Sequence, residues 1–329
     1  MYSNSPSPAR KSIAGFLATQ PSRISHLWHR LLLRVCCLPK QWVILIASNP
    51  QNKSLSWQDF KPVLPPADRD WADPFILADQ GLYYIFIEEK LYATKRGRIV
   101  CLTVNQRMEI QSYQVVLERP YHLSYPFILK YNGQLYMIPE TAENNQIELY
   151  RCIRFPDQWI FEKPLIKNIK AVDSTLVEYE GKWWLFANII EPGGNSWDTL
   201  HLYFSNDPLS SNWIAHPQNP IVKDMHLARP AGAIQKSQEY LIRPSQDCSI
   251  RYGYATNFNR ITKMTENAYA ENRQSIYLPM ENGAYIGVHT WNQANGLVAI
   301  DAIFRIKRFS SPASIFPKKL LHPSPKPYS

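Results

Sequence analysis

The amino-acid sequence predicts an all-β protein, a five-bladed β-propeller with short basic N- and C-terminal extensions. Three observations lead to this prediction. A pattern of about 50 residues recurs along the chain, each copy reads as a β-hairpin, and one apolar strand near the start has no hairpin of its own. A four-stranded propeller blade has this length, whereas a two-sheet sandwich does not explain the repeat.

Four copies of the repeat align without gaps. Each begins with a residue that we call the anchor, followed by Gly or Ser after eight positions and by an aromatic residue after eleven. An apolar strand, a polar turn and an aromatic strand in this order predict a hairpin. The anchors lie 52, 48 and 56 residues apart and are Asp73, Tyr125, Asp173 and Arg229.

Further strands complete the blades. The apolar segments 146–153 and 201–205 precede loops that end at Trp159 and Trp213, where another strand is expected to begin. These strands and the hairpin give about four strands per unit, as in a propeller blade.

A fifth and more degenerate unit covers residues 284–306, with His289 near the anchor position. The early apolar strand at 41–48 would then join this last blade and close the ring, which removes exposed sheet edges.

The formal charge of +9 belongs to the two ends of the chain. Residues 1–40 and 305–329 each carry six basic and no acidic residues, which leaves a net charge of −3 on residues 41–304. A basic groove for nucleic acid is therefore not expected in the body.

We expect three parts: a basic leader at 1–40, the propeller at 41–309 and a basic Pro/Ser-rich tail at 310–329. Residues 24–37 can form an amphipathic helix, which either packs on the propeller rim or lies on a membrane surface. The five cysteines show neither a CxxC pair nor metal-ligand spacing, so we expect reduced thiols, no metal and no cofactor. A cytoplasmic location follows, with peripheral contact at the inner membrane face through the basic ends as a further expectation.

The repeat also predicts a polar site. Antiparallel pairing returns the residue fifteen positions after an anchor to the same face, so these residues and the anchors should ring one mouth of the central channel. Carboxylates and arginines bind sugar hydroxyls through charge-assisted hydrogen bonds, which suits a hydroxyl-rich ligand. Beside Asp73, Asp173 and Glu140, the residues expected to bind it are Glu88, His122, Tyr125, Asn188, Arg229, Arg243, Asp247 and His289.

A series of short motifs marks a family resemblance. ADPF, IEE, SYPF, MIPE, DSTL, WWLF, LARPAG, RPSQDCS, GVHT and AIDA occur in this order. Over residues 41–309 the chain resembles the propeller domain that precedes the sugar-transfer domain of plant glucosamine inositolphosphorylceramide transferases. More distantly, it is similar to the five-bladed propellers of glycoside hydrolase families 43, 62, 32 and 68.

The resemblance implies roles for three carboxylates. In family 43, an Asp of blade one activates water, an Asp of blade three tunes a pKa and a Glu of blade four is the general acid. Asp73 matches the first role and Asp173 the second. The anchor of blade four is Arg229, which cannot be a general acid near neutral pH. An enzyme would need another acid, and Glu140 is the candidate.

Three functions stay open at this point. The first is a carbohydrate- or glycolipid-recognising propeller associated with sugar transfer or envelope polysaccharide synthesis, with a glycosyltransferase as partner. The second is a glycoside hydrolase-like enzyme that uses Asp73, Asp173 and Glu140, and the third is a protein-interaction propeller. The resemblance does not extend to a separate glycosyltransferase domain, so that activity is not expected in this chain. Converging carboxylates would favour the first two functions.

Overall fold

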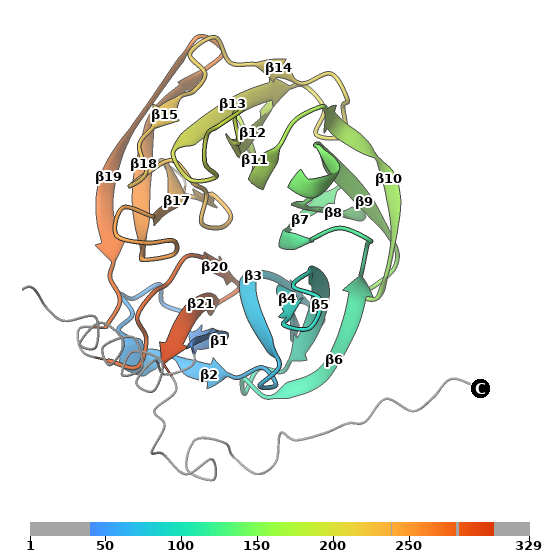
Figure 1. The fold of residues 1–329 in the computed structure, drawn as a ribbon, viewed down its shortest axis with the longest axis vertical. Coiled ribbons are helices and arrows are strands. Elements are labelled where there is room, and N and C mark those ends of the chain that lie inside the picture. The colour runs from blue at the N-terminus through green and yellow to red at the C-terminus, as the bar shows by residue number, and fades with distance from the viewer. Residues whose placement is uncertain (1–39, 238, 281–282, 306–329) are drawn as a thin grey trace, which may run out of the picture. The chain divides into compact units, whose positions relative to one another are not determined.

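The computed structural model describes residues 40–237, 239–280 and 283–305. Five antiparallel sheets stand around a common axis (Figure 1). The predicted all-β, five-bladed propeller is therefore confirmed. The expected leader helix at 24–37 lies outside the described residues. Within the described ranges, no helix is long and apolar enough to cross a bilayer.

The strands of blades one to four follow the chain outward from the axis. Blade one contains β3 (Arg69–Asp79), β4 (Leu82–Leu91), β5 (Gly97–Val104) and β6 (Ile110–Leu117). Blade two contains β7 (Ser124–Tyr131), β8 (Gln134–Glu140), β9 (Gln146–Arg154) and β10 (Gln158–Lys167). Blade three contains β11 (Ala171–Tyr179), β12 (Lys182–Ile189), β13 (Thr199–Ser205), β14 (Ile214–Ala215) and the short β15 (Val222–Lys223). Blade four contains β16 (Gln235–Lys236), β17 (Leu241–Asp247), β18 (Ala255–Thr265) and β19 (Ala268–Tyr277). Two short 3-10 helices cover Trp57–Asp59 and Ala142–Asn144.

Blade five is built from both ends of the described body. It contains β20 (Trp291–Ala294), β21 (Leu297–Arg305), β1 (Lys40–Ser48) and β2 (Lys61–Val63). Strand β1 pairs with β21 along its whole length, from Lys40 opposite Arg305 to Ser48 opposite Leu297. The closure expected for the early apolar strand is thus confirmed, and it explains why that strand lacks a hairpin of its own.

Three inner strands carry the same irregularity at their anchors. Asp73, Tyr125 and Asp173 have φ angles of +52°, +43° and +55°, and the pairing register with the next strand shifts at each of them. Non-glycine residues rarely adopt this left-handed conformation. A β-bulge of this kind re-aims a side chain and frees backbone groups from the ladder. The repeat therefore places three bent strands, and not only three anchor side chains, around the axis.

The chain direction puts all anchors at one end of the propeller. We call the end at which β3, β7 and β11 begin the anchor face. Because neighbouring strands are antiparallel, β21 ends and β1 begins at this face too. Cys101, Cys152 and Cys248 are buried free thiols, while Cys36 and Cys37 lie outside the described residues.

Candidate functional site

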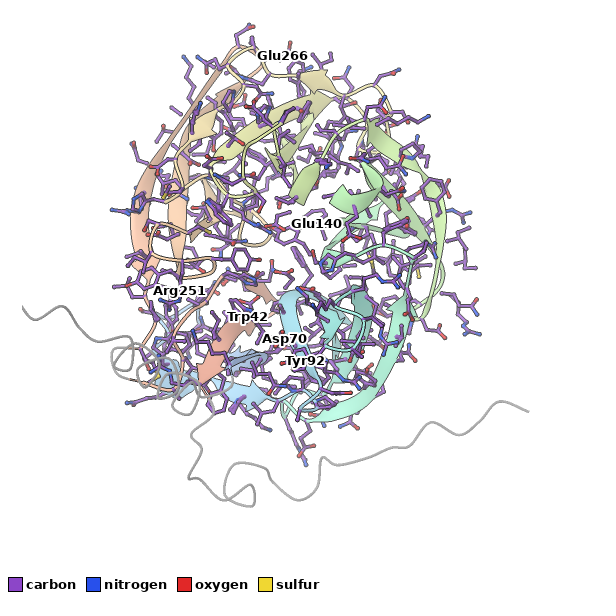
Figure 2. All side chains as sticks on the ribbon, viewed as in Figure 1. Trp42, Asp70, Tyr92, Glu140, Arg251 and Glu266 are labelled. Carbon is purple, nitrogen blue, oxygen red and sulfur yellow. The ribbon has the colours of Figure 1, made fainter. Side chains whose placement is uncertain are left out.

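Side chains from three blades meet at Arg229. Its Nε donates a hydrogen bond of 2.5 Å to Asp173 Oδ2, and its Nη2 lies 3.8 Å from Glu140 Oε2. Glu140 lies near the centre of the ring in Figure 2. The guanidinium side chain is only 8% exposed, so it depends on the Asp173 carboxylate for its charge balance. Arg229 therefore neutralises Asp173 instead of offering a proton to a ligand.

Neutral hydrogen-bond partners hold the remaining atoms of this group. Arg229 Nη1 donates to the backbone oxygen and the hydroxyl of Ser196, both at 3.0 Å. Gln246 Nε2 donates to Asp173 Oδ2 at 3.0 Å. The hydroxyl of Tyr125 accepts from the backbone N–H of Gly232 at 2.7 Å. These contacts cross between blades and fix the side chains in one geometry.

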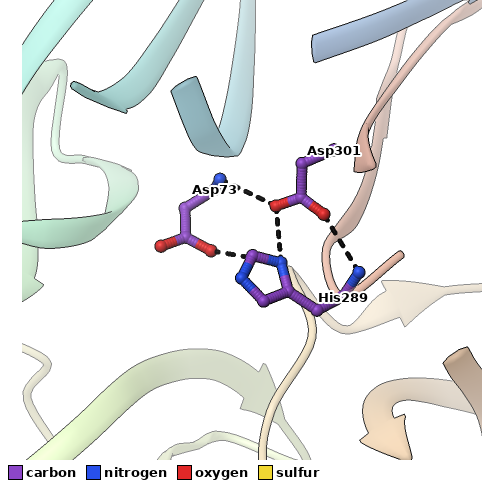
Figure 3. Close-up of side chains that lie close together, drawn as sticks. All are labelled: Asp73, His289 and Asp301. Atoms are coloured by element: carbon purple, nitrogen blue, oxygen red, sulfur yellow. Dashed lines mark hydrogen bonds and ion pairs between the residues drawn. The ribbon is translucent and has the colours of Figure 1, made fainter. Parts of the chain in front are cut away.

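A second group, shown in Figure 3, joins blade one to blade five. His289 Nδ1 donates to Asp301 Oδ2 at 2.6 Å, and Asp301 Oδ2 also accepts the backbone N–H of Asp73 at 2.9 Å. Asp73 Oδ1 accepts the hydroxyl of Thr290 at 2.8 Å and lies 3.9 Å from His289 Nδ1. Burial alone would lower the pKa of His289, but the Asp301 carboxylate raises it above its usual value. The positive charge of His289 is therefore favoured between two carboxylates.

Asp73, His289 and Asp301 could also hold a metal ion, since one ligand atom from each lies within 4.8 Å of the others. Asp301 Oδ1 accepts the backbone N–H groups of His289 and Thr290, both at 3.0 Å. Its Oδ2 accepts two further hydrogens, as described above. A cation at Asp301 would have to compete with these four hydrogen bonds.

The carboxyl groups near the axis have raised pKa values. Burial raises the pKa of Asp73 to about 6, and the neighbouring carboxylates add to this effect. Burial raises the pKa of Glu140 to about 8, with Asp173 as the next cause. Burial also raises the pKa of Glu88 well above its usual value. At neutral pH, Glu140 is therefore mainly a carboxylic acid, and Asp73 is mainly ionised.

His122 is held neutral beside Glu88. Its Nδ1 accepts the backbone N–H of Gly97 at 2.9 Å, so Nε2 carries the proton and faces Glu88 Oε1 at 3.3 Å. Burial, followed by the charge of Lys90, lowers the pKa of His122 to about 4. A Cβ atom at Gly97 would lie 2.3 Å from the Leu123 carbonyl oxygen, so this close approach requires glycine.

Most of the sequence-predicted residues meet at the axis, but Arg243 and Asp247 do not. Arg243 forms a two-pronged ion pair with Glu271, at 2.8 and 2.5 Å, on the outer strand of its own blade. Gln246 occupies the place expected for Arg243, because side chains alternate along β17 and Arg243 points to the other face. Asp247 accepts hydrogen bonds from Ser249 and stabilises the following loop.

Asn188 takes the position in blade three that Glu140 takes in blade two. Its Cα pairs with Val172, immediately before the anchor, as Glu140 pairs with Ser124. The side chain is fully buried, and neither amide atom has a hydrogen-bond partner among the described residues.

Sequence reasoning missed several members of the site. Asp301 could have been identified from the sequence, because it is the single carboxylate within the apolar strand LVAIDAIFR. Tyr252 had none, since its place depends on the path of a loop. The Arg229 guanidinium lies 4.9 Å from the centre of the Tyr252 ring, and this ring meets His289 edge-on at 5.2 Å. Tyr252 remains 38% exposed and is the most accessible aromatic of the group.

The family model described as "Glucosamine inositolphosphorylceramide transferase 1, N-terminal" matches residues 63–300. A glucosamine inositolphosphorylceramide transferase 1 of Oryza sativa subsp. japonica is 34% identical over 261 residues, which are 76% of this chain and 34% of the relative. Its namesake from Arabidopsis thaliana is 30% identical over 255 residues, 74% of this chain and 32% of the relative. The chain thus spans about a third of the length of the curated relatives it matches.

Solved glycoside hydrolases share the fold. A family 117 glycoside hydrolase of Zobellia galactanivorans has a TM-score of 0.52 and 14% identity, and the match covers 80% of this chain and 91% of that one. The arabinanase Arb43A of Bacillus subtilis has a TM-score of 0.51 and 13% identity, with 70% and 93% covered. At this identity the likeness establishes the five-bladed architecture alone.

Proposed function

Since this chain belongs to the family of the N-terminal domain of glucosamine inositolphosphorylceramide transferase 1, we propose that it recognises a carbohydrate or a glycolipid headgroup in support of sugar transfer. The observation that carries the proposal is the convergence of unlike polar side chains from all five blades near the axis. A scaffold repeat would keep similar residues at equivalent positions, whereas here the anchors are two Asp, a Tyr, an Arg and a His. A glycosyltransferase that acts on the same glycan is the partner we propose.

The chemistry of the accessible groups suits sugar hydroxyls. The side chains of Glu88, Glu140 and His122 are 12%, 13% and 19% exposed, so solvent reaches part of each. A protonated carboxyl both donates and accepts a hydrogen bond, as does a sugar hydroxyl. The Tyr252 ring offers a face for the apolar side of a sugar ring. Hydroxyl pairing and ring stacking together would fix the orientation of the ligand.

A glycan panel tests this proposal. The panel includes inositol phosphate, glucosaminyl and uronosyl headgroups, and binding is measured for the wild type and for Asp73→Asn. We expect Asp73→Asn to weaken binding, because it removes the charge between His289 and Thr290. Asp79→Asn is the matched control, since it lies at the other end of the same strand and is exposed. Failure of the wild type to bind any glycan on a broad panel would refute the proposal.

A second candidate function, glycoside hydrolysis, is favoured by the separation of two pKa values. Asp73, with a pKa of about 6, is a suitable base, and Glu140, with a pKa of about 8, keeps the proton that a leaving group needs. Such a split between two carboxyl groups assigns the base and the acid. In this reaction Asp73 would take a proton from water as the water oxygen bonds to the anomeric carbon, and Glu140 would protonate the glycosidic oxygen as its bond to that carbon breaks. Arg229 lies beside Glu140, and Thr290 holds Asp73.

Hydrolysis of nitrophenyl glycosides separates the two functions. Turnover that is lost in both Asp73→Asn and Glu140→Gln would support an enzyme. Glycan binding without turnover in the wild type would instead identify a recognition module.

A further inference from the structure

Two loops beside the site expose apolar side chains on the anchor face. Met225, Ile250 and Tyr252 are 42%, 65% and 38% exposed. The loops lie side by side, since the backbone N–H of Cys248 donates to the Met225 carbonyl at 2.9 Å. Ile250 has the highest exposed fraction among the large apolar side chains of the described residues. Exposed apolar groups that gather at one place mark an interaction surface more often than scattered ones.

Basic residues adjoin this apolar group. Burial lowers the pKa of Arg251, and the nearby positive charge of Arg305 lowers it further. Arg305 on β21 lies directly opposite Lys40 on the neighbouring strand β1. Arg251 follows Ile250 in the chain, so these three cationic residues lie along the same part of the anchor face, and Arg251 is labelled in Figure 2. Like charges held together favour a polyanionic partner.

The sequence carries more positive charge in the segments that precede Lys40 and follow Arg305. Residues 1–39 carry five basic residues and residues 306–329 carry five more, with no acidic residue in either segment. They are covalently joined to Lys40 and Arg305, which are neighbours on the anchor face. Ten basic residues therefore connect to the propeller at one place, next to the exposed apolar side chains.

We propose that this corner of the anchor face, formed by Met225, Ile250, Tyr252, Arg251, Arg305 and Lys40, docks on the surface of an anionic membrane. Met225 and Ile250 enter the boundary between headgroups and acyl chains, while basic side chains remain near lipid phosphates. Long acid-free segments suit a lipid surface, because its charge is spread over a large area and needs no fixed geometry. The mouth of the propeller then faces the headgroups, whatever ligand it takes.

Vesicle co-sedimentation of the full chain tests the proposal. The probes are vesicles of phosphatidylcholine and vesicles of phosphatidylcholine mixed with phosphatidylglycerol. We expect binding to the mixed vesicles only, weakening as salt increases. Ile250→Asp should reduce the partition coefficient about tenfold. The triple variant Lys40→Gln/Arg251→Gln/Arg305→Gln should reduce it about a hundredfold, at roughly fivefold for each charge.

Matched controls lie at the opposite end of the propeller. Ile214→Asp changes an isoleucine that is 58% exposed, and Lys130→Gln/Arg107→Gln/Lys263→Gln removes the same charge from exposed positions. These controls should bind vesicles as the wild type does, and circular dichroism confirms that each variant is folded. Hydrogen exchange should show vesicle-dependent protection at residues 224–228 and 248–254.

Three results would overturn the proposal. One is equal binding of the wild type and the triple variant, which would assign vesicle binding to the flanking segments alone. Another is an equal loss of vesicle binding in the control variants, which would show that the total charge of the protein, and not this corner, determines binding. The third is a wild type that ignores anionic vesicles but binds polyglutamate, which would identify an acidic polypeptide as the partner.

Discussion

Replacing Glu140 by glutamine should stabilise the protein, and the gain should grow with pH. The folded state keeps Glu140 protonated up to a pKa of about 8, whereas the unfolded chain ionises it near its usual value of 4.5. The folded state therefore holds this proton more tightly than the unfolded chain does. As pH rises between the two pKa values, the free energy of unfolding of the wild type falls. Glutamine has the shape of the protonated acid and does not titrate. At pH 7, keeping Glu140 protonated lowers the free energy of unfolding of the wild type by about 3 kcal/mol, because each pH unit above the usual pKa contributes about 1.4 kcal/mol.

The window from about pH 6.5 to pH 8 isolates this effect. The lowered pKa of His122 has the opposite sign, since it adds stability as pH rises, but its contribution is complete by pH 6.5. Guanidinium denaturation across the window should show the stability of Glu140→Gln rising relative to the wild type by about 1 kcal/mol per pH unit on average, with the slope declining as pH 8 is approached. Glu178→Gln, an exposed position on β11, should show no such trend. A pH-independent difference, or a loss of stability in Glu140→Gln throughout, would refute the assignment of a buried proton to Glu140.

Three further substitutions test how the site is held. Arg229→Met should lower the free energy of unfolding by about 3–5 kcal/mol, because it leaves Asp173 buried without its partner. The double variant Arg229→Met/Asp173→Asn should recover most of this loss. A double variant that is no more stable than Arg229→Met would contradict this pairing. Gly97→Ala should cost about 1–3 kcal/mol, because the added methyl group meets a backbone carbonyl oxygen at 2.3 Å; an unchanged melting temperature would show that the strand can shift freely. Arg243→Met should lower the free energy of unfolding by about 3 kcal/mol through the loss of its ion pair with Glu271, yet leave the glycan affinity of the folded protein unchanged. A loss of glycan affinity at unchanged stability would show instead that Arg243 contacts the ligand.

The anchors of blades one to three could be predicted from sequence because the repeat is regular there. A hairpin of fixed length ties the residue fifteen positions on to its anchor, and Glu88 and Glu140 lie where this count puts them. The bulges at Asp73 and Asp173 could not be read from the repeat. A left-handed φ at Asp leaves no clear pattern in the neighbouring residues, and it depends on hydrogen bonds from other blades.

Blade four shows where counting fails. Its inner strand is reduced to Gln235–Lys236, and the anchor region pairs with β17 through an isolated bridge between Pro230 and Ser245. Without a full ladder, the register no longer follows the hairpin length. Gln246 therefore faces Asp173, and Arg243 turns to the blade interface.

Asp301 and Tyr252 illustrate two other limits. Asp301 lies on the second strand of blade five, outside the positions that the repeat marks, although its charge within an apolar strand was a usable signal. Tyr252 reaches the axis through a loop whose path is set by packing, including Gly253, where a Cβ atom would lie 2.6 Å from the Trp42 ring. Such a contact joins residues from blades four and five that no local pattern connects.

A crystal structure with the tightest-binding glycan of the panel tests the central claim most directly. A sugar at the anchor face, with hydroxyl groups within hydrogen-bond distance of Glu140 and Glu88 and its apolar face on the Tyr252 ring, is the predicted result. A glycan bound elsewhere on the propeller, with the Asp73 and Arg229 groups untouched, would contradict the proposal that the convergence of five blades built a carbohydrate site.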